Sequence, residues 1–361
     1  MTSIIGTVGP SSINGPTLNK LKELGLDGFR LNLSHLNPKS LEYYYEILKI
    51  NNIIPSLDTQ GAQVRVIDLP DKTVFKLDER LSLGSPVGSQ LSNFDRSYDV
   101  GINHAEFFDS VIPGDQLKIG FDGLLAVIEE VDSESKICVL RIISPGSIVL
   151  NRALDVAGKS MILEPFTNFD LKAIKNSFEH DVEAIYVSFC ESGSTLKRLN
   201  NLLAEAGFSL KKPKIIAKIE NKKGVINLPE IAALADGILI DRGDLSREIQ
   251  ISFLPSVVAS IIRTCRNFDT PCYVATNILD SMMDGSLPSR AEISDIHNLL
   301  SQGVSGFVLA AEMAIGNQPI ESVMVLKLMA KVYQLEQRGL ASHFSIEELN
   351  QHLSPRLKAW L

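Results

Sequence analysis

The chain has 361 residues, of which 45% are hydrophobic, and its formal net charge is −8. This length and apolar content allow one large domain or two unequal ones. An acidic chain with no run rich in lysine and arginine is a poor match for nucleic acid. No apolar run reaches the ~18 residues that a transmembrane helix needs. We therefore expect a globular protein that binds neither nucleic acid nor a membrane.

The four cysteines are Cys138, Cys190, Cys265 and Cys272, and they form no CxxC pair or metal-binding spacing. At least three of them lie in apolar runs, so we interpret them as small buried hydrophobic residues. The N-terminal segment MTSIIGTVGPSS lacks the basic start and the long apolar core of a signal peptide. Both features favour a reducing compartment and predict a cytoplasmic location.

Short apolar segments alternate with amphipathic segments over most of the sequence. The predicted strands are 3–9, 28–34, 53–59, 184–189, 214–220, 237–243, 272–276 and 306–311. The predicted helices are 17–25, 40–50, 170–181, 194–207, 227–235, 256–267, 292–303 and 319–339. Strands that are apolar throughout are typical of a parallel sheet. Eight β/α units predict an α/β fold of the (β/α)8 or TIM barrel type, with a doubly wound open sheet as the alternative.

The segment after the third strand breaks this alternation. It contains β-type runs separated by Gly, Pro, Asp and Ser, and no convincing helix. We interpret it as an inserted β-rich domain that could act as a lid. The predicted organisation is a barrel over 1–61 and 159–340, a lid domain over 62–158, and a helical C-terminal tail over 341–361.

Charged residues occupy the ends of two predicted buried strands. Lys218 and Glu220 lie two residues apart, so a strand directs both side chains to one face. The next strand ends in Arg242, Gly243 and Asp244. Buried charges are costly, and the carboxyl ends of parallel strands are where α/β active sites lie. A divalent metal held by Glu220 and Asp244, beside Lys218, would suit phosphoryl or enolate chemistry.

Other polar residues lie at or just past the ends of predicted barrel strands. They are Arg30, Asn32, Ser34, His35, Asp58, Thr59 and Thr276. Each has a purely structural interpretation. Arg30 could form an ion pair with Asp58, whereas Asp244 and Thr276 could cap helices. Their convergence on one edge favours an active site.

The chain resembles the pyruvate kinase family over nearly its whole length. The motifs that carry the resemblance occur in family order: IIGTVGPSS, FRLNLSH, SLDTQGAQVR, IAKIENKKGV, ILIDRGDL, VATNILDSM with PSRAEISD, and AAEMAIGNQPIESV. The resemblance implies a (β/α)8 barrel with a β-domain inserted after the third strand. It also implies the transfer of a phosphoryl group between phosphoenolpyruvate and ADP.

The resemblance also implies residue roles around the transferred group. Lys218 would neutralise the phosphoryl group, and Arg30 would hold the phosphate. Glu220 and Asp244 would bind Mg²⁺ (or Mn²⁺). The backbone N–H groups of Gly243 and Asp244 would bind the substrate carboxylate, and Thr276 would belong to the water relay that protonates the enolate carbon.

Further roles concern a monovalent cation and the nucleotide. Asn32, Ser34, Asp58 and Thr59 would form a K⁺ site. Arg65 and Arg152 would reach the phosphates of ADP, and His35 would lie on the nucleotide side.

The sequence departs from the family pattern around this set. DTKGPEIR is the usual family motif, but here Gln60 replaces Lys and Ala62 replaces Pro. Gln63 stands where family members carry Glu or Lys, a choice linked to whether K⁺ is needed, so the neutral Gln63 leaves K⁺ dependence open. Asp241 is a third acid beside the metal ligands, where it could repel the substrate carboxylate or pair with Arg242. The SGETA motif becomes AAEMA over 310–314, which removes two hydroxyls.

The family's C-terminal effector-binding domain has no counterpart in this sequence. The resemblance therefore implies a chain without sugar-phosphate allostery. A homo-oligomer would form through barrel surfaces.

The sequence is compatible with three functions. The leading one is a pyruvate kinase-like phosphotransferase acting on phosphoenolpyruvate or a related enol phosphate. The alternatives are a metal-dependent 2-oxo acid lyase or decarboxylase, and a non-catalytic protein that binds phosphoenolpyruvate or nucleotide. Retention of Arg65 and Arg152 argues against the lyase, because only a nucleotide needs them.

Overall fold

The computed structural model describes residues 2–70, 72–85, 98–120, 124–159, 161, 163–208, 212–339 and 355. The chain divides into two compact units, Met1–Gly61 with Phe166–Leu361, and Ala62–Pro165. The second unit therefore extends past residue 158, where the sequence placed its end. The predicted helical tail over 341–361 lies outside the described residues, apart from residue 355.

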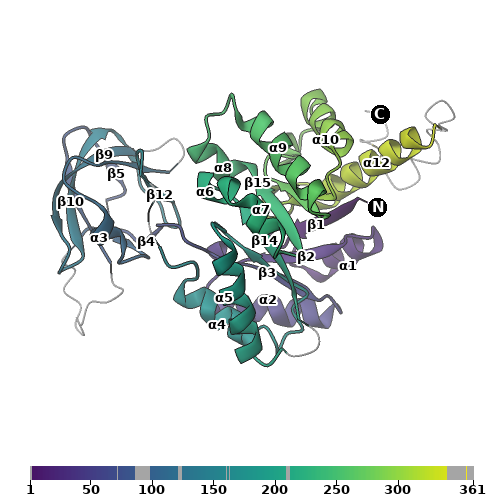
Figure 1. Cartoon of the computed structure of the whole chain (residues 1–361), viewed down its shortest axis with the longest axis horizontal. Coiled ribbons are helices and arrows are strands. Elements are labelled where there is room, and N and C mark those ends of the chain that lie inside the picture. Colours follow the sequence, from purple (N-terminus) through teal and green to yellow (C-terminus); the bar gives the residue numbers. More distant parts are fainter. Residues whose placement is uncertain are drawn as a thin grey trace. The chain divides into compact units, whose positions relative to one another are not determined.

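The first unit is a closed barrel of eight parallel strands (Figure 1). The strands are β1 (Ser3–Thr7), β2 (Gly28–Asn32), β3 (Pro55–Asp58), β13 (Ala184–Val187), β14 (Lys214–Ile219), β15 (Gly237–Asp241), β16 (Cys272–Ala275) and β17 (Gly306–Leu309). Their order around the barrel is β1-β17-β16-β15-β14-β13-β3-β2. The predicted (β/α)8 barrel is confirmed, and the open doubly wound sheet is wrong, because β1 pairs with both β2 and β17.

Helices follow the barrel strands and cover their outer face (Figure 1). They are α1 (Gly15–Glu23), η1 (Leu33–His35), α2 (Pro38–Ile50), α4 (Asn168–Asn176), α5 (Gly193–Glu205), α6 (Lys222–Ile226), α7 (Leu228–Ala232), α8 (Arg242–Glu248), α9 (Leu254–Asn267), η2 (Asp280–Met282), α10 (Arg290–Gln302), α11 (Ala311–Ala314) and α12 (Pro319–Gln337). Capping boxes define where several begin, for example Ser289 with Glu292 at α10. In the part of the chain that the structure describes, no helix is both long enough and apolar enough to cross a membrane.

The alternation of side chains along each strand decides which residues reach the barrel interior. The interior cluster includes Ile5, Ala184, Tyr186, Ile216, Leu239, Ala275 and Val308. Lys218 and Glu220 follow Ile216 at steps of two, and Asp241 follows Leu239 in the same way. All three charged residues are therefore directed to the inner face at the carboxyl ends of their strands.

The second unit is built almost entirely of strands. They are β4 (Val66–Asp68), β5 (Val74–Phe75), β6 (Arg80–Gly84), β7 (Val100–Ile102), β8 (Gln116–Ile119), β9 (Leu124–Asp132), β10 (Ile137–Ser144), β11 (Gly146–Ser147) and β12 (Leu154–Val156). Seven form one sheet in the order β12-β8-β9-β10-β6-β7-β4, and β11 pairs with β5. The expectation of no helix is wrong at α3 (Phe107–Ser110). This single turn buries Phe107 and Phe108 completely, and a segment so short carries no helical periodicity to detect.

All four cysteines are free and buried, as the sequence predicted. Burial raises the pKa of the Cys138 thiol and that of the Cys190 thiol to about 12.

Because the thiolate is the reactive form, we expect an aromatic disulfide reagent to label none of the four cysteines in the native protein. The same reagent should label all four in guanidinium chloride. Labelling of the folded chain within minutes would contradict this expectation.

Candidate active site

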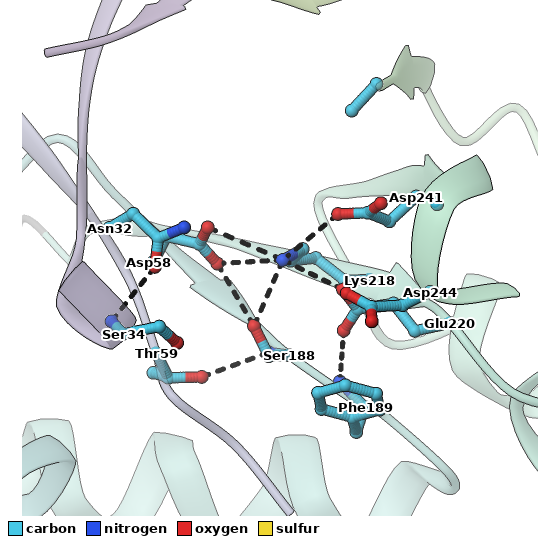
Figure 2. Close-up of polar contacts among 12 residues, drawn as sticks. Asn32, Ser34, Asp58, Thr59, Ser188, Phe189, Lys218, Glu220, Asp241 and Asp244 are labelled. Atoms are coloured by element: carbon cyan, nitrogen blue, oxygen red, sulfur yellow. Dashed lines mark hydrogen bonds and ion pairs between the residues drawn. The ribbon is translucent and has the colours of Figure 1, made fainter. Parts of the chain in front are cut away.

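A buried lysine lies at the centre of the inner rim at the carboxyl ends of the strands. The Nζ atom of Lys218 is 2.9 Å from Oε1 of Glu220, 3.2 Å from Oδ1 of Asp58 and 3.5 Å from Oδ2 of Asp241. It also donates a hydrogen bond of 3.1 Å to the Ser188 hydroxyl. Asp58 and Ser188 lie on one side of this ammonium group, and Glu220, Asp241 and Asp244 lie on the other (Figure 2). The residues come from β3, β14, β15 and the segments that follow β13, β14 and β15, so the closed barrel brings them together.

Glu220 is fixed by the backbone of a neighbouring segment. The N–H of Phe189 donates to Oε2 of Glu220 at 2.6 Å (Figure 2). Phe189 has a φ of 50°, a left-handed conformation that non-glycine residues seldom adopt. The chain therefore accepts backbone strain just after β13, and the resulting turn directs an N–H group at the carboxylate.

Three carboxylates at this rim could share one metal ion. One oxygen from each of Glu220, Asp241 and Asp244 lies within 4.8 Å of the other two. Glu220 and Asp241 are buried and Asp244 is half-buried. Oxygen ligands of this kind suit a hard divalent cation. The predicted metal ligands Glu220 and Asp244 therefore lie close together, and Asp241 lies beside them as a third acid.

The ionisation of this cluster reflects burial first and neighbouring charges second. Burial raises the pKa of the Glu220 carboxyl to about 8. The Lys218 ammonium opposes that rise, whereas the carboxylates of Asp241 and Asp244 add to it. Burial alone would lower the pKa of Lys218, but the charges of Asp58, Glu220 and Asp241 raise it above its ordinary value. Lys218 is therefore a permanent cation, and added positive charge would favour the ionised form of Glu220.

Arg30 forms an ion pair with Asp58, as its purely structural interpretation predicts. Its NH1 atom lies 2.8 Å from Oδ2 of Asp58, and both side chains are almost completely buried. Its Nε and NH2 atoms donate to Oγ1 of Thr7 at 3.1 and 2.6 Å. The Asp58 carboxylate thus lies between the guanidinium of Arg30 and the ammonium of Lys218. Arginine has five N–H donors, so this pairing leaves donors for another ligand.

The remaining residues of the predicted K⁺ site lie near Asp58. Oδ1 of Asn32, the N-cap residue of η1, accepts a hydrogen bond of 3.0 Å from the backbone N–H of Ser34. Oγ1 of Thr59 accepts a hydrogen bond of 3.0 Å from the N–H of Ser188. The structure therefore gathers Asn32, Ser34, Asp58 and Thr59 in one region of the rim (Figure 2). His35 is exposed at the end of η1.

Thr276 holds the start of α8. Its hydroxyl donates to the carbonyl of Ala275 at 2.6 Å and accepts from the N–H of Gly243 at 2.8 Å. Thr276 does not cap η2, which begins at Asp280 after the N-cap residue Leu279. Asp244 is not the N-cap of α8 either, because that position belongs to Asp241.

Arg242 does not take the partner that the sequence suggested. Its NH1 atom lies 2.6 Å from Oδ2 of Asp295, and its Nε and NH2 atoms donate to the carbonyl of Thr276. Of the two alternatives for Asp241, the pairing with Arg242 is therefore wrong, because the guanidinium is already fixed against α10 and the turn after β16. This contact supports Thr276 and Asn277, whose φ values are 66° and 52°.

Glu312 organises the same turn from the side of β17. Its buried carboxylate accepts hydrogen bonds from the N–H groups of Ile278, Leu279 and Ala310 at 3.1, 3.3 and 3.0 Å.

We expect Glu312→Ala to lower the free energy of unfolding by at least about 2 kcal/mol, since buried donors lose their acceptor. Urea unfolding measures the change. Glu205→Ala, the same substitution at an exposed helical position, is the control, and equal losses in the two variants would contradict the role of Glu312.

The two arginines assigned to the nucleotide belong to the β-rich unit. Arg65 forms a β-bridge with Ala153, and the N–H of Val66 donates to the carbonyl of Arg152 at 2.9 Å. The guanidinium of Arg65 donates to the carbonyl of Asn151 at 2.9 Å, while Arg152 is exposed. The two residues therefore lie on adjacent segments of this unit.

Ser188 is a functional candidate that the sequence analysis did not single out. It bonds to Lys218 and donates to Oδ1 of Asp58 at 3.1 Å. It directly follows β13. The other candidates also lie at or just past the ends of barrel strands. Its position at the end of a strand could have identified Ser188 as a candidate. An isolated, uncharged serine in an apolar run does not stand out in the sequence.

Fold and site together define a (β/α)8 barrel protein with an inserted β unit and a lysine–carboxylate site at the carboxyl ends of its strands. The family model described as "Pyruvate kinase, barrel domain" matches residues 1–323. The chain therefore belongs to the pyruvate kinase family.

Relatives with known names agree with this assignment. Plastidial pyruvate kinase 3 of Arabidopsis thaliana is 32% identical over 336 residues, which cover 91% of this chain and 57% of that protein. Pyruvate kinase of Thermotoga maritima is 31% identical over 347 residues, covering 91% and 70%. The crystal structure of Cryptosporidium parvum pyruvate kinase matches with a TM-score of 0.82 at 26% identity, covering 92% and 70%. The chain thus spans less than six-tenths of the plastid relative's length.

Proposed function

We propose that this chain transfers a phosphoryl group between phosphoenolpyruvate, or a related enol phosphate, and ADP. The observation that carries the proposal is the buried ammonium of Lys218, fixed between Asp58 and the carboxylates of Glu220 and Asp241. Phosphoryl transfer depends mainly on positioning and on charge stabilisation, and a rigid buried cation provides both. Membership of the pyruvate kinase family supports this reaction over other barrel chemistries.

The donor set fits a divalent cation. Glu220 and Asp244 would hold Mg²⁺ or Mn²⁺, because oxygens of these two carboxylates lie within 4.8 Å of each other at the rim. The bound ion would supply positive charge to the phosphoryl oxygens and to the enolate oxygen. Asn32, Ser34, Asp58 and Thr59 offer the oxygen atoms that a K⁺ ion would need.

The other residues would bind and orient the reactants. Lys218 would neutralise charge on the phosphoryl group as it moves, and Arg30 would offer its remaining N–H donors to the phosphate. The N–H groups of Gly243 and Asp244 would face the substrate carboxylate. The N–H of Gly243 would first have to leave the Thr276 hydroxyl.

Proton and nucleotide positions complete the proposal. Thr276 would support the water that protonates the enolate carbon. Arg65 and Arg152 would bind the phosphates of ADP, with His35 on the nucleotide side. The lid role of the β-rich unit, the assembly into a homo-oligomer and the cytoplasmic location stay predictions from the sequence.

The test is a turnover assay on the purified chain with Mg²⁺, K⁺, phosphoenolpyruvate and ADP. Pyruvate and ATP are measured separately. Formation of pyruvate should require ADP, and formation of ATP should require phosphoenolpyruvate. Pyruvate released from a 2-oxo diacid without ATP would instead support a lyase. If calorimetry showed binding of neither Mg²⁺ nor phosphoenolpyruvate, the catalytic proposal would be overturned.

A further inference from the structure

Asp241 is a buried acid at the inner rim, beside the predicted metal ligands. It ends β15 and occupies the N-cap position of α8, yet its side chain makes no capping hydrogen bond. It follows the interior residue Leu239 by two positions, so its carboxylate faces the inside of the rim. Its neighbours are the ammonium of Lys218, the carboxyl group of Glu220 and the backbone of Asp244, so it belongs to the lysine–carboxylate cluster.

The Asp241 carboxylate is buried beside Lys218 and close to the other acids of the rim. Its side chain is only 9% exposed, and its Oδ2 atom lies 3.5 Å from Nζ of Lys218. Its Oδ1 atom is buried and has no hydrogen-bond partner among the residues that the structure describes. The adjacent Arg242 pairs with Asp295 instead. Burying an unmatched acceptor on a charged group is expensive, so a further positive partner is expected.

The charge balance of the cluster points to a cation. The buried carboxylates are those of Asp58, Glu220 and Asp241, and the buried cations are Lys218 and Arg30. Asp244 adds a half-buried carboxylate, and NH1 of Arg247 lies 3.9 Å from its Oδ1 atom. When Glu220 is ionised, the rim therefore carries more negative than positive charge in a region shielded from water. A divalent ion would reverse this imbalance.

The geometry permits one ion to contact all three acids. Oxygens on opposite sides of Mg²⁺ are about 4 Å apart, and those around Ca²⁺ about 5 Å apart. Oxygens of Glu220, Asp241 and Asp244 lie within 4.8 Å of one another, so a small side-chain adjustment at most is needed. We propose that Asp241 is a third protein ligand of the divalent cation, together with Glu220 and Asp244. This inference rests on the metal site of the proposed function.

A third carboxylate changes what the site can do. Three carboxylates bind a divalent ion more tightly than two, because affinity rises with the number of charged ligands. The ion would therefore be held before any substrate arrives. It would also have fewer water-filled positions for substrate oxygens and less residual positive charge to attract an anion. Asp241 would thus limit the substrate to one that needs fewer metal contacts.

Metal binding without substrate tests the inference. The full chain, stripped of metal, is titrated with Mn²⁺ by calorimetry, and Asp241→Ala and Asp241→Asn are compared with the wild type. We expect Asp241→Ala to bind Mn²⁺ at least about tenfold more weakly, since even residues that only support ligands contribute 10–100-fold. We expect a smaller loss for Asp241→Asn, which keeps an oxygen in place. Water proton relaxation should show more water on the bound Mn²⁺ in Asp241→Ala.

The control removes an equal charge from the exposed residue that begins η2. Asp280→Asn should bind Mn²⁺ as the wild type does. If both Asp241 variants kept the wild-type affinity and relaxation, the third-ligand assignment would be wrong and the two-ligand site would stand. If the wild type bound no Mn²⁺, the metal site and the inference would both fall. Circular dichroism verifies folding, and Asp241→Asn, nearly identical in shape, carries the test if Asp241→Ala fails to fold.

Discussion

Lys218→Met is expected to abolish phosphoryl transfer, lowering kcat by about 10³-fold or more. Mutation of single groups that stabilise transition-state charge has effects of this order. Methionine fills a similar volume but carries no charge, so the phosphoryl group would lose its nearest fixed cation. The measurement is the coupled turnover assay with phosphoenolpyruvate, ADP and Mg²⁺.

A second consequence of this substitution has to be separated from catalysis. Lys218 lies within 3.5 Å of three buried carboxylates, so its loss leaves them with Arg30 as their main buried cation. Loss of one member of a buried ion network also destabilises the fold. Lys218→Arg keeps the charge but alters its position, and we expect it to fold normally while remaining strongly impaired.

The matched control for Lys218→Met is Lys223→Met. Lys223 belongs to α6, is 38% exposed and pairs with Glu191 at 3.0 Å. An exposed ion pair contributes little, so this variant should keep turnover within about twofold of the wild type. A folded Lys218→Met protein with more than about one-tenth of wild-type turnover would contradict the role of the lysine.

Periodicity alone predicted much of the barrel and its central charges. Apolar segments such as GILID and CYVA identify buried strands, because the strands of a closed barrel contact side chains on both faces. The two-residue step from Lys218 to Glu220 fixed their common face, and the structure places Nζ and Oε1 2.9 Å apart. The apolar strands and the common face of Lys218 and Glu220 depend on residues that are close together in the sequence, so the sequence alone can predict them.

Features set by distant contacts were not predictable in this way. The direction of Arg242 depends on Asp295 in α10, and the left-handed turn at Thr276 and Asn277 depends on Glu312 beyond β17. Ser188 gained importance only when barrel closure brought β13 beside β3 and β14. Each of these contacts joins segments far apart along the chain, and spacing within one segment carries no information about them.

Arg30→Met is expected to destabilise the fold more than any substitution of a surface ion pair. Arg30 and Asp58 are each at most 2% exposed, and NH1 lies 2.8 Å from Oδ2. Removing one partner of a buried pair typically costs about 3–5 kcal/mol, because the other charge stays buried without compensation. Asp58 would keep Lys218 at 3.2 Å, so the loss should fall toward the lower end of that range. Urea unfolding of the metal-free chain measures the change.

The double variant Arg30→Met/Asp58→Asn separates the lost pair from lost packing. Once Asp58 is neutral, removing Arg30 leaves no unmatched carboxylate, so the double variant should be more stable than the sum of the two single losses predicts. Lys327→Met, which breaks a half-exposed pair with Asp27, should cost about 1 kcal/mol or less. Strict additivity of the two buried substitutions would show that Arg30 stabilises the barrel by its packing alone. Coupling would show that the ion pair between Arg30 and Asp58 itself stabilises the fold beside Lys218, which is the arrangement that the proposed chemistry requires.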